Sequence, residues 1–467
     1  MDALKVLLVN PPIPDYFYNR EFYCPSSLLY LGAVLQKHGH VPKILDLKIF
    51  QKEKDPPDSF FEEQLIRSIK GFQPNLIGIG SLFSGNFPDV IKLTELTKAH
   101  FPTIPNVIGG IHPTLYAQEI LDNCPSVDSI VLGEGEESIL DIANAMRGKG
   151  RYEVIAGFAY RHQGKTVINP KRNYIRDVDS IPMPAYDLIR LEDYYMDTSR
   201  WHNPKNLPIN TSIPIISSRS CPNRCSFCSM YQVMGPTWRA RSSLNVVDEI
   251  EQVYHLYNHR HFSFMDDNFT FNKARLLEIC HEIIRRKLDI QFETPNGISI
   301  KTIDEAMLDA MVAAGLVRTS LAIESGSDFI RNQIMRKNVS REKIFEVMNL
   351  TRKYSQLHVS TFFIVGMPEE TKETLEETYH MIQALRPDKT IVMNLVPFPG
   401  TAVYTQALRD NLLVGVQNDP LYLSNDRYFT NYDQIFLKPY QLELDALRDF
   451  RTKCNKLLEN QKPRGIC

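Results

Sequence analysis

Residues 217–230 read SSRSCPNRCSFCSM and place Cys221, Cys225 and Cys228 in a C-x3-C-x2-C pattern. The apolar run IPIISS at 213–218 predicts a β-strand, so the three thiols are expected in a loop at a strand end. Three thiolates from one short loop can bind three corners of a cubane iron–sulfur cluster and leave the fourth iron open to an outside ligand. The pattern therefore predicts a 4Fe–4S cluster in the middle of the chain.

Two other interpretations of this cysteine loop stay open. A zinc site needs a fourth protein ligand at tetrahedral spacing, and the nearby His202 and His255 do not complete a recognisable finger. The three thiols can also be unrelated to one another. The other five cysteines are scattered, and a chain of 467 residues needs no disulfide framework, so we interpret them as structural or incidental thiols.

The sequence around the cysteine loop alternates strands with helices. Between residues 211 and 400, strand-like runs are separated by helical patterns such as 245–257 and 372–385. Six such units predict a partial (β/α)6 barrel of the TIM type, in which the chemistry lies at the carboxyl ends of the strands. The six expected strands span residues 213–218, 261–267, 290–296, 316–325, 359–366 and 389–398.

With Phe227 directly before the last cysteine, the loop resembles that of the radical S-adenosylmethionine (SAM) superfamily, over roughly residues 211–400. The resemblance implies that the open iron binds the amino and carboxylate groups of SAM. It also implies that an electron from the cluster cleaves SAM to methionine and a 5′-deoxyadenosyl radical. A reducing partner such as flavodoxin or ferredoxin is expected on the same ground.

FMDDNFT at 264–270 ends the second expected barrel strand. In the family, polar groups at this place bind the methionine amino group of SAM, so the resemblance makes Asp266 and Asp267 the candidates. A carboxylate that faces an ammonium group in a partly dry site forms a favourable charge pair. The alternative is that Asp267 or Asn268 caps the helix that follows.

Two further stretches fit the resemblance. LAIESGSD at 321–328 ends the fourth strand, where the family places ribose and carboxylate contacts. The resemblance makes Glu324 an acceptor for ribose hydroxyls and Ser325 an additional polar contact. FIVGMPEET at 363–371 resembles the strand that contacts adenine, and Gly366 would let the backbone approach the base.

Residues 1–150 alternate strands and helices as well, and their strands are apolar throughout. This predicts a doubly wound, Rossmann-like parallel sheet that is covered on both faces. Glycines at the strand ends either admit a ligand to the carboxyl edge of the sheet or only form turns. Beside the downstream domain, this part resembles the cobalamin (B12)-binding subgroup, because Ser81 followed by Gly109 and Gly110 is similar to its pocket for the dimethylbenzimidazole tail.

The D-x-H-x-x-G loop, which supplies an axial histidine in other cobalamin domains, is missing from the sequence. Its absence is common in the radical subgroup, so cobalamin remains an expected cofactor. His112 follows the glycine pair at the expected ligand edge. It either contacts a bound corrin or substrate or caps the following helix, and we favour the cap.

The remaining segments connect and extend these domains. Residues 151–210 are polar and proline-bearing, which predicts a linker that packs across domain surfaces. The expected domains are a cobalamin-binding-like domain at 1–150, the linker at 151–210, a radical SAM core at 211–400 and a helical, charged C-terminal extension at 401–467.

The formal net charge of −2 excludes an overall basic face, so neither nucleic acid nor an anionic membrane is an expected partner. No apolar run of about 18 residues predicts a transmembrane helix. The opening residues, MDALKVLLVNPP, show no basic region and no cleavage site, so we expect no secretion signal and a cytoplasmic protein.

The leading functional hypothesis is cobalamin-dependent methylation of an unactivated carbon, or less often phosphorus, in a small-molecule or lipid substrate. The same architecture could instead perform a cyclisation, a carbon–carbon coupling or an anaerobic oxidation in which the N-terminal domain transfers no methyl group. A non-catalytic iron–sulfur sensor is disfavoured because a sensor needs no SAM-binding residues. The sequence identifies neither the substrate nor a catalytic acid or base.

Overall fold

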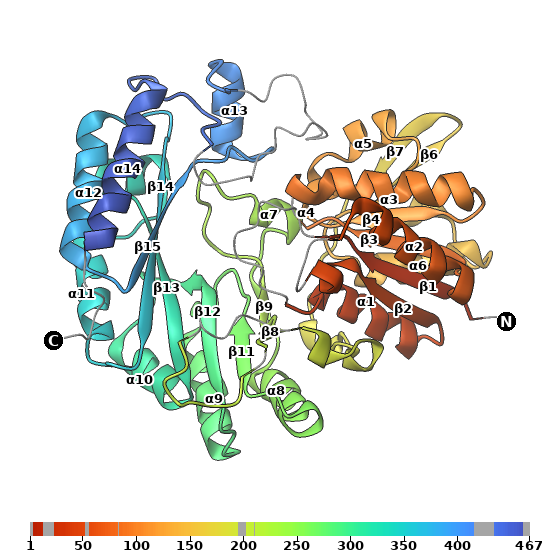
Figure 1. The fold of residues 1–467 in the computed structure, drawn as a ribbon, viewed down its shortest axis with the longest axis horizontal. Coiled ribbons are helices and arrows are strands. Elements are labelled where there is room, and N and C mark those ends of the chain that lie inside the picture. Colours follow the sequence, from red (N-terminus) through yellow and green to blue (C-terminus); the bar gives the residue numbers. More distant parts are fainter. Residues whose placement is uncertain are drawn as a thin grey trace. The chain divides into compact units, whose positions relative to one another are not determined.

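The computed structural model describes residues 3–12, 23–51, 56–82, 84–194, 202–209, 211–414 and 434–460. These residues divide into two compact units (Figure 1). Unit 1 holds the described residues before 195 together with Gln232–Gly235, and unit 2 holds the others. Each unit is built around its own sheet.

Unit 1 contains a seven-stranded sheet in the order β2-β1-β3-β4-β5-β6-β7. The first five strands are parallel, as the sequence predicts. The strand order 2-1-3-4-5 has a topological switch point between β1 and β3, because the chain adds β2 on one side of β1 and the later strands on the other. Open α/β sheets bind ligands at such a point. The parallel strands are β1 Lys5–Asn10, β2 Val41–Asp46, β3 Leu76–Gly80, β4 Asn106–Gly109 and β5 Ser129–Val131.

Helices cover both faces of this sheet. Val6 and Leu8 of β1 belong to a core cluster with residues of α1 and α6, whereas Leu7 and Val9 are equally buried on the opposite side of the strand. Helices α2 and α3 pack against each other. The helices are α1 Ser26–Lys37, α2 Asp58–Phe72, α3 Phe87–His100, α4 Ile111–Leu115, α5 Ala117–Asn123 and α6 Glu136–Met146.

A β-hairpin that we did not expect extends this sheet. Strands β6 Phe158–His162 and β7 Lys165–Asn169 run antiparallel and continue from β5, within the stretch that the sequence suggested to be irregular. Gln163 and Gly164 form the two-residue turn, both with positive φ, as a type I′ hairpin requires. Phe158 and Tyr160 of β6 stack at 5.4 Å, and both belong to the core cluster of unit 1.

Within the expected linker, the described residues 170–194 belong to unit 1 and form three short 3-10 turns, namely Val178–Ser180, Tyr186–Leu188 and Leu191–Asp193, whereas the described residues 202–209 belong to unit 2. Ala185 donates its backbone N–H to Leu29 O of α1 at 3.2 Å. Tyr194 is buried and donates its hydroxyl to Asp46 Oδ2 at 2.9 Å. This segment therefore folds as part of the N-terminal unit.

Unit 2 contains a six-stranded, all-parallel sheet in the order β8-β11-β12-β13-β14-β15. Strands β11 to β14 are each followed along the chain by a helix on the outer side of the sheet (Figure 1), which confirms the predicted partial barrel. The strands are β8 Ile213–Ile215, β11 His261–Phe264, β12 Gln291–Ile298, β13 Leu316–Glu324, β14 His358–Val365 and β15 Lys389–Asn394. The helices are α8 Ser243–Tyr257, α9 Lys273–Arg285, α10 Glu305–Ala313, α11 Arg341–Thr351, α12 Lys372–Leu385 and α13 Ala402–Arg409.

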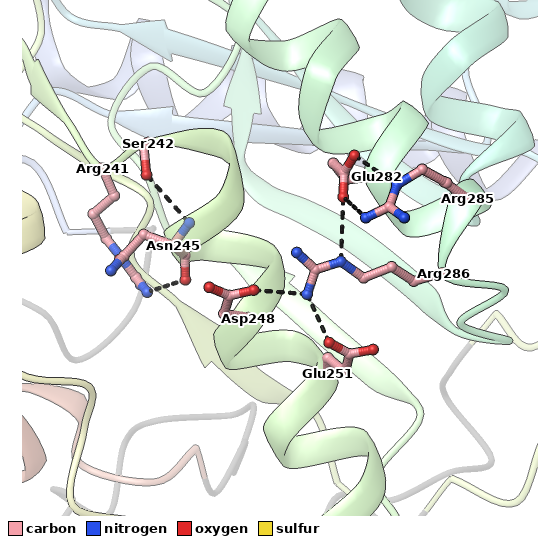
Figure 2. Close-up of polar contacts among 8 residues, drawn as sticks. All are labelled: Arg241, Ser242, Asn245, Asp248, Glu251, Glu282, Arg285 and Arg286. Atoms are coloured by element: carbon pink, nitrogen blue, oxygen red, sulfur yellow. Dashed lines mark hydrogen bonds and ion pairs between the residues drawn. The ribbon is translucent and has the colours of Figure 1, made fainter.

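Charged side chains join the first two outer helices of the barrel (Figure 2). Arg286, at the end of α9, donates to Asp248 at 2.7 Å and to Glu251 at 2.6 Å, both on α8. Arg286 and Arg285 also bind Glu282, and the Arg285 hydrogen bond is the main reason why the pKa of Glu282 falls to about 2. The network keeps the two helices side by side on the outside of the barrel.

The described part of the C-terminal extension contains helix α14 Leu444–Asn460, which packs on α12 and β15. Figure 1 shows α14 beside α12. The prediction of a helical extension is confirmed for these residues, while residues 415–433 and 461–467 lie outside the described chain. Among the described helices, none combines the length and the apolar character that a bilayer crossing requires.

Candidate functional site

The cysteine loop leaves the barrel at the carboxyl end of its first strand. Strand β9 Ser218–Arg219 pairs antiparallel with β10 Arg239–Ala240, and the three cysteines lie in the loop between them, before the short helix α7 Met230–Val233. Cys225 is buried, and Cys221 and Cys228 are half-buried. All three are free thiols, so they can serve as ligands.

Backbone hydrogen bonds fix the middle of this loop to the later part of the barrel. Ser226 donates its N–H to Met335 O at 3.1 Å, and Ser226 O accepts from Val403 N at 3.1 Å. Phe227 packs against the apolar cluster that contains Met335 and Val403. The loop therefore holds its shape without a bound group.

Two buried arginines fix the beginning of the loop. The carbonyl of Ser217 accepts from the backbone N–H of Arg241 at 3.0 Å and from Arg275 Nη2 at 2.7 Å. Arg241 forms a buried ion pair with Glu249 and binds Asn245 of α8, the second contact being visible in Figure 2. This clamp fixes the strand end from which the cysteines project.

The two aspartates predicted to contact SAM occupy different environments. Asp266 is buried, and Oδ1 accepts from the Ser217 hydroxyl at 2.8 Å and from the Ser218 hydroxyl, while Oδ2 accepts from Ser217 N at 3.2 Å. Its hydrogen bonds therefore stabilise the turn into the cysteine loop.

Asp267 is half-buried and accepts a backbone hydrogen bond from Ser220, next to Cys221. Burial, and then the charge of Asp266, raise the pKa of Asp267 to about 7. Of the pair, Asp267 is the carboxyl group that interacts electrostatically with Cys228.

The capping alternative for this segment is wrong. Helix α9 begins at Lys273, and its N-cap is Asn272, whose side chain accepts from Arg275 N at 3.0 Å. Asn268 instead lies near the cysteine loop, and its Nδ2 is 3.7 Å from Cys221 Sγ. Because Asn272 caps α9, Asp267 and Asn268 are available to the site at the cysteine loop.

The electrostatic environment of the thiols suits a metal-bound state. Burial raises the pKa of Cys225 and raises that of Cys228 to about 12, so without a metal these thiols are protonated at neutral pH. Metal binding would deprotonate them. No three His, Cys, Asp or Glu side chains among the described residues converge as ligands of a single ion do. A cubane binds each thiolate at a separate iron and is compatible with this loop.

Glu324 is the last residue of β13 and has an unusual backbone. Its φ is 71°, and the register of β13 against β14 shifts at this point. Its Oε1 accepts from Lys337 Nζ at 2.7 Å. The sequence analysis did not identify Lys337, which lies in the polar RKN turn at 336–338. Its link to Glu324 appears only once the chain is folded.

Ser325 is completely buried within its own turn. Its Oγ lies 3.3 Å from the hydroxyl of Thr378 and accepts from Ser327 N at 3.2 Å. The serine therefore supports the turn after β13, and its hydroxyl is already used by neighbouring protein groups.

Gly366 follows β14 with a φ of 95°, a conformation that favours glycine. Its N–H donates to Glu370 Oε2 at 2.8 Å, and Met367 N donates to the same atom at 3.2 Å. Glu370 is fully buried, and burial raises its pKa to about 7. The carboxyl group of Glu370 thus fixes the backbone at the end of β14.

In unit 1, Ser81 and Gly110 lie in direct backbone contact at the carboxyl ends of β3 and β4. Ser81 donates its N–H to Gly109 O at 2.7 Å, and a Cβ at Gly110 would lie 2.2 Å from Ser81 O. The φ of Gly110 is 120°. Only glycine fits this position.

The Ser81 hydroxyl is buried and, among the described residues, has no hydrogen-bond partner. A buried hydroxyl without a partner beside a strand end that excludes side chains offers a donor to a ligand. These two features fit the nucleotide tail of a cobalamin, which the sequence resemblance places here.

His112 lies inside the fold rather than at an open edge. It is completely buried, its ring lies 4.3 Å from that of Phe87 and 4.7 Å from that of Tyr116, and its Nδ1 is 2.9 Å from Ser84 Oγ. Burial lowers its pKa to about 3, so the ring is neutral. Helix α4 begins after Gly110 without a side-chain cap, so the capping interpretation of His112 is wrong.

Comparison with known proteins finds one family match in each of the two units. Residues 215–382 match the radical SAM superfamily, and residues 21–143 match the B12 binding domain. The chain belongs to the radical SAM superfamily and carries a B12-binding domain. Together the two families indicate a 4Fe–4S cluster, SAM and cobalamin as its cofactors.

Relatives of this radical SAM enzyme differ in the reaction for which they are named. The chain is 28% identical over 89% of its length to an uncharacterized methyltransferase of Pyrococcus horikoshii, of which it covers 85%. It is 29% identical over 84% of its length to the anaerobic magnesium-protoporphyrin IX monomethyl ester cyclase of Cereibacter sphaeroides, of which it covers 61%.

A solved structure shares the fold over most of the chain. The radical SAM methyltransferase TsrM of Kitasatospora setae, with cobalamin and a 4Fe–4S cluster bound, superposes with a TM-score of 0.71 at 18% identity. The match covers 88% of this chain and 75% of TsrM. The likeness confirms the predicted fold class, with the parallel sheet first and the radical SAM domain after it.

Proposed function

We propose that the chain is a cobalamin-dependent methyltransferase that methylates an unactivated carbon of a small-molecule or lipid substrate. The group bound by the cysteine loop would supply the electron that cleaves SAM, and the corrin would carry the methyl group. The observation that carries the proposal is the buried Ser81 hydroxyl, which has no hydrogen-bond partner among the described residues and lies beside Gly110 in a B12-binding domain of a radical SAM enzyme.

Cys221, Cys225 and Cys228 are the proposed cluster ligands. The clamp on Ser217 and the hydrogen bonds of Ser226 support this assignment, because they hold the loop in one conformation before any group binds. The partial exposure of Cys221 and Cys228, beside the buried Cys225, supports access of an external ligand to the cluster.

The SAM contacts follow from the same geometry. Asp267 is the better candidate for the methionine amino group, because Asp266 already accepts hydrogen bonds from Ser217 and Ser218. Glu324 retains the role of ribose acceptor, and Gly366 that of backbone contact to adenine. The buried hydroxyl of Ser325 makes it a support for Glu324 rather than a contact.

The domain assignment that goes with this function keeps the cobalamin-binding domain at 1–150, the radical SAM core at 211–400 and the extension at 401–467. The stretch 151–210 joins them, and its hairpin and turns support the N-terminal sheet. A low-potential reductant such as flavodoxin or ferredoxin would deliver the electron.

A second candidate function is supported by one observation. The cyclase of Cereibacter sphaeroides is as similar in identity to this chain as the uncharacterized methyltransferase is. A radical cyclisation or oxidation would use the same cysteine loop and SAM contacts but would need no methyl group on the corrin.

Transfer of a labelled methyl group separates the two functions without knowledge of the substrate. The reconstituted protein, loaded anaerobically with cobalamin and reduced, is incubated with SAM that carries a deuterated methyl group, and the retained corrin is analysed by mass spectrometry. The methyltransferase proposal expects labelled methyl on the corrin, and about tenfold less of it or lower with the Gly110→Ala variant, which retains less corrin. A corrin that stays unlabelled while SAM is cleaved would contradict it and favour the second function.

A further inference from the structure

Lys337 and Glu324 form a buried ion pair that the proposed SAM chemistry does not explain. Their closest atoms are 2.7 Å apart, and the side chains are 17% and 8% exposed. Removing two charges from water is unfavourable unless each charge finds a partner. A pair at this depth therefore has a strong field that solvent does not screen.

The backbone around this pair is strained at three positions. Glu324 has a φ of 71°, and the neighbours of Lys337, Arg336 and Asn338, have φ values of 58° and 55°. A left-handed conformation is unfavourable for most non-glycine residues, and such residues concentrate at functional sites. The fold thus accepts strain on both sides of the pair in order to place the lysine inside.

The segment that carries Lys337 is bonded to the cysteine loop. Met335 O accepts from the N–H of Ser226, which lies between Cys225 and Cys228, and Lys337 N donates to Arg331 O at 3.0 Å. These hydrogen bonds fix the turn of Lys337 relative to the thiols. The distance between the lysine charge and the cysteines is therefore set by the fold.

The electrostatic interactions show which thiols this lysine faces. Burial raises the pKa of Cys225, and among the charges Lys337 opposes this shift more strongly than Glu324 adds to it. Burial lowers the pKa of Lys337 most, but Glu324, Cys225 and Cys221 raise it above its usual range. The lysine is charged, and its field acts on two of the three cysteines.

We propose that Lys337 sets the reduction potential of the cluster held by Cys221, Cys225 and Cys228, with Glu324 as the opposing charge. The inference rests on the cluster assignment of the proposed function. The step concerned is the transfer of one electron from a low-potential one-electron donor to the cluster, in which no bond forms or breaks. Because the cluster becomes more negative by one charge, a fixed cation nearby favours the reduced state.

The test is an anaerobic redox titration of the reconstituted protein without SAM, with dithionite as reductant and the reduced cluster measured by electron paramagnetic resonance. Lys337→Gln is expected to lower the ratio of reduced to oxidised cluster at a fixed potential by about tenfold, which is 59 mV for one electron. Lys337→Arg keeps the charge and is expected to keep the wild-type midpoint.

The opposing charge gives a second test with the opposite sign. Glu324→Gln is expected to raise the midpoint, and the double variant is expected to lie between the wild type and Lys337→Gln, because Lys337 acts more strongly on Cys225. Lys353→Gln is the matched control, since Lys353 pairs with Glu305 on the surface, where both side chains are 53% exposed. If the Lys337→Gln variant binds no cluster, the test rests on Glu324→Gln alone. A rise in its midpoint potential supports the inference, and a fall contradicts it.

Equal midpoints for the wild type, Lys337→Gln and Glu324→Gln would overturn this inference and leave the proposed function intact. A wild-type protein that binds no cluster would overturn both. A shift with the expected sign supports the role of Lys337 whether or not the protein transfers a methyl group, because cobalamin takes no part in the titration.

Discussion

The two ligand sites of this chain are built in opposite ways. Around Ser81 and Gly110, the site consists of backbone, one glycine and one hydroxyl, with no charged group in the contact. Around the cysteine loop, buried charges surround the ligands, including Arg241 with Glu249 and Lys337 with Glu324. On the proposed function, the first site would bind its cofactor through backbone and one hydroxyl, and the second would bind a group that changes its charge.

The largest expected effect is the loss of a cluster ligand, which tests the site at the cysteine loop. Cys225→Ala is expected to abolish the visible absorbance of the reconstituted cluster and all SAM cleavage, because two thiolates cannot hold the cubane. The matched control is Cys280→Ala, since Cys280 is equally buried but lies on α9 away from the loop. Full cluster absorbance in Cys225→Ala would refute the ligand assignment.

The next largest effect concerns the clamp on Ser217. Arg241→Ala leaves Glu249 buried without its ion-pair partner, which is expected to cost about 3–5 kcal/mol in the free energy of unfolding. Denaturant unfolding of the apo-protein measures this. Lys353→Ala should cost less than about 1 kcal/mol, because its pair with Glu305 is exposed. Similar costs for both variants would show that the buried charges around the cysteine loop have no special role.

The site in unit 1 should instead be sensitive to one methyl group. Gly110→Ala is expected to cost about 1–3 kcal/mol and to weaken cobalamin retention by about tenfold or more, because its Cβ would overlap Ser81 O. Equilibrium dialysis with hydroxocobalamin measures the second effect. Gly148→Ala also has a positive φ but meets no atom within 4 Å, so it separates strain from overlap. Unchanged cobalamin retention in Gly110→Ala would contradict the assignment of Ser81 and Gly110 to the cobalamin site.

The smallest effect is a pH dependence at Glu370. Its pKa in the folded state, about 7, lies above its ordinary value of 4.5, so the folded state binds the proton more tightly than the unfolded state. The free energy of unfolding of the wild type should therefore fall relative to that of Glu370→Gln, by about 2 kcal/mol, as the pH rises from 5 to 8. Parallel stability profiles of the two proteins would contradict the raised pKa.

The sequence predicted the sheets of both sites better than the side chains that surround them. Local spacing places Cys221, Cys225 and Cys228 in one loop, and apolar runs reveal the parallel strands, because both signals lie within a few residues. The hairpin at 158–169 was missed because its strands carry polar side chains and its Gln-Gly turn is less distinctive than Asn-Gly.

Tertiary contacts explain what the sequence could not predict. Asp266 and Asp267 are adjacent, and only the fold shows that Ser217 and Ser218 bind the first of them. Lys337 was missed because a lysine in a polar turn is usually exposed, and its partner Glu324 lies thirteen residues earlier. His112 was expected at a helix end and instead packs in the aromatic core.

The most direct test of the central claim is to count both cofactors on one protein. The chain is reconstituted anaerobically with iron, sulfide and methylcobalamin, desalted, and analysed for iron, sulfide and corrin. The account predicts about one 4Fe–4S cluster and about one corrin per chain. A cluster that is retained without any corrin would contradict cobalamin-dependent methylation and leave a radical SAM enzyme of another reaction class.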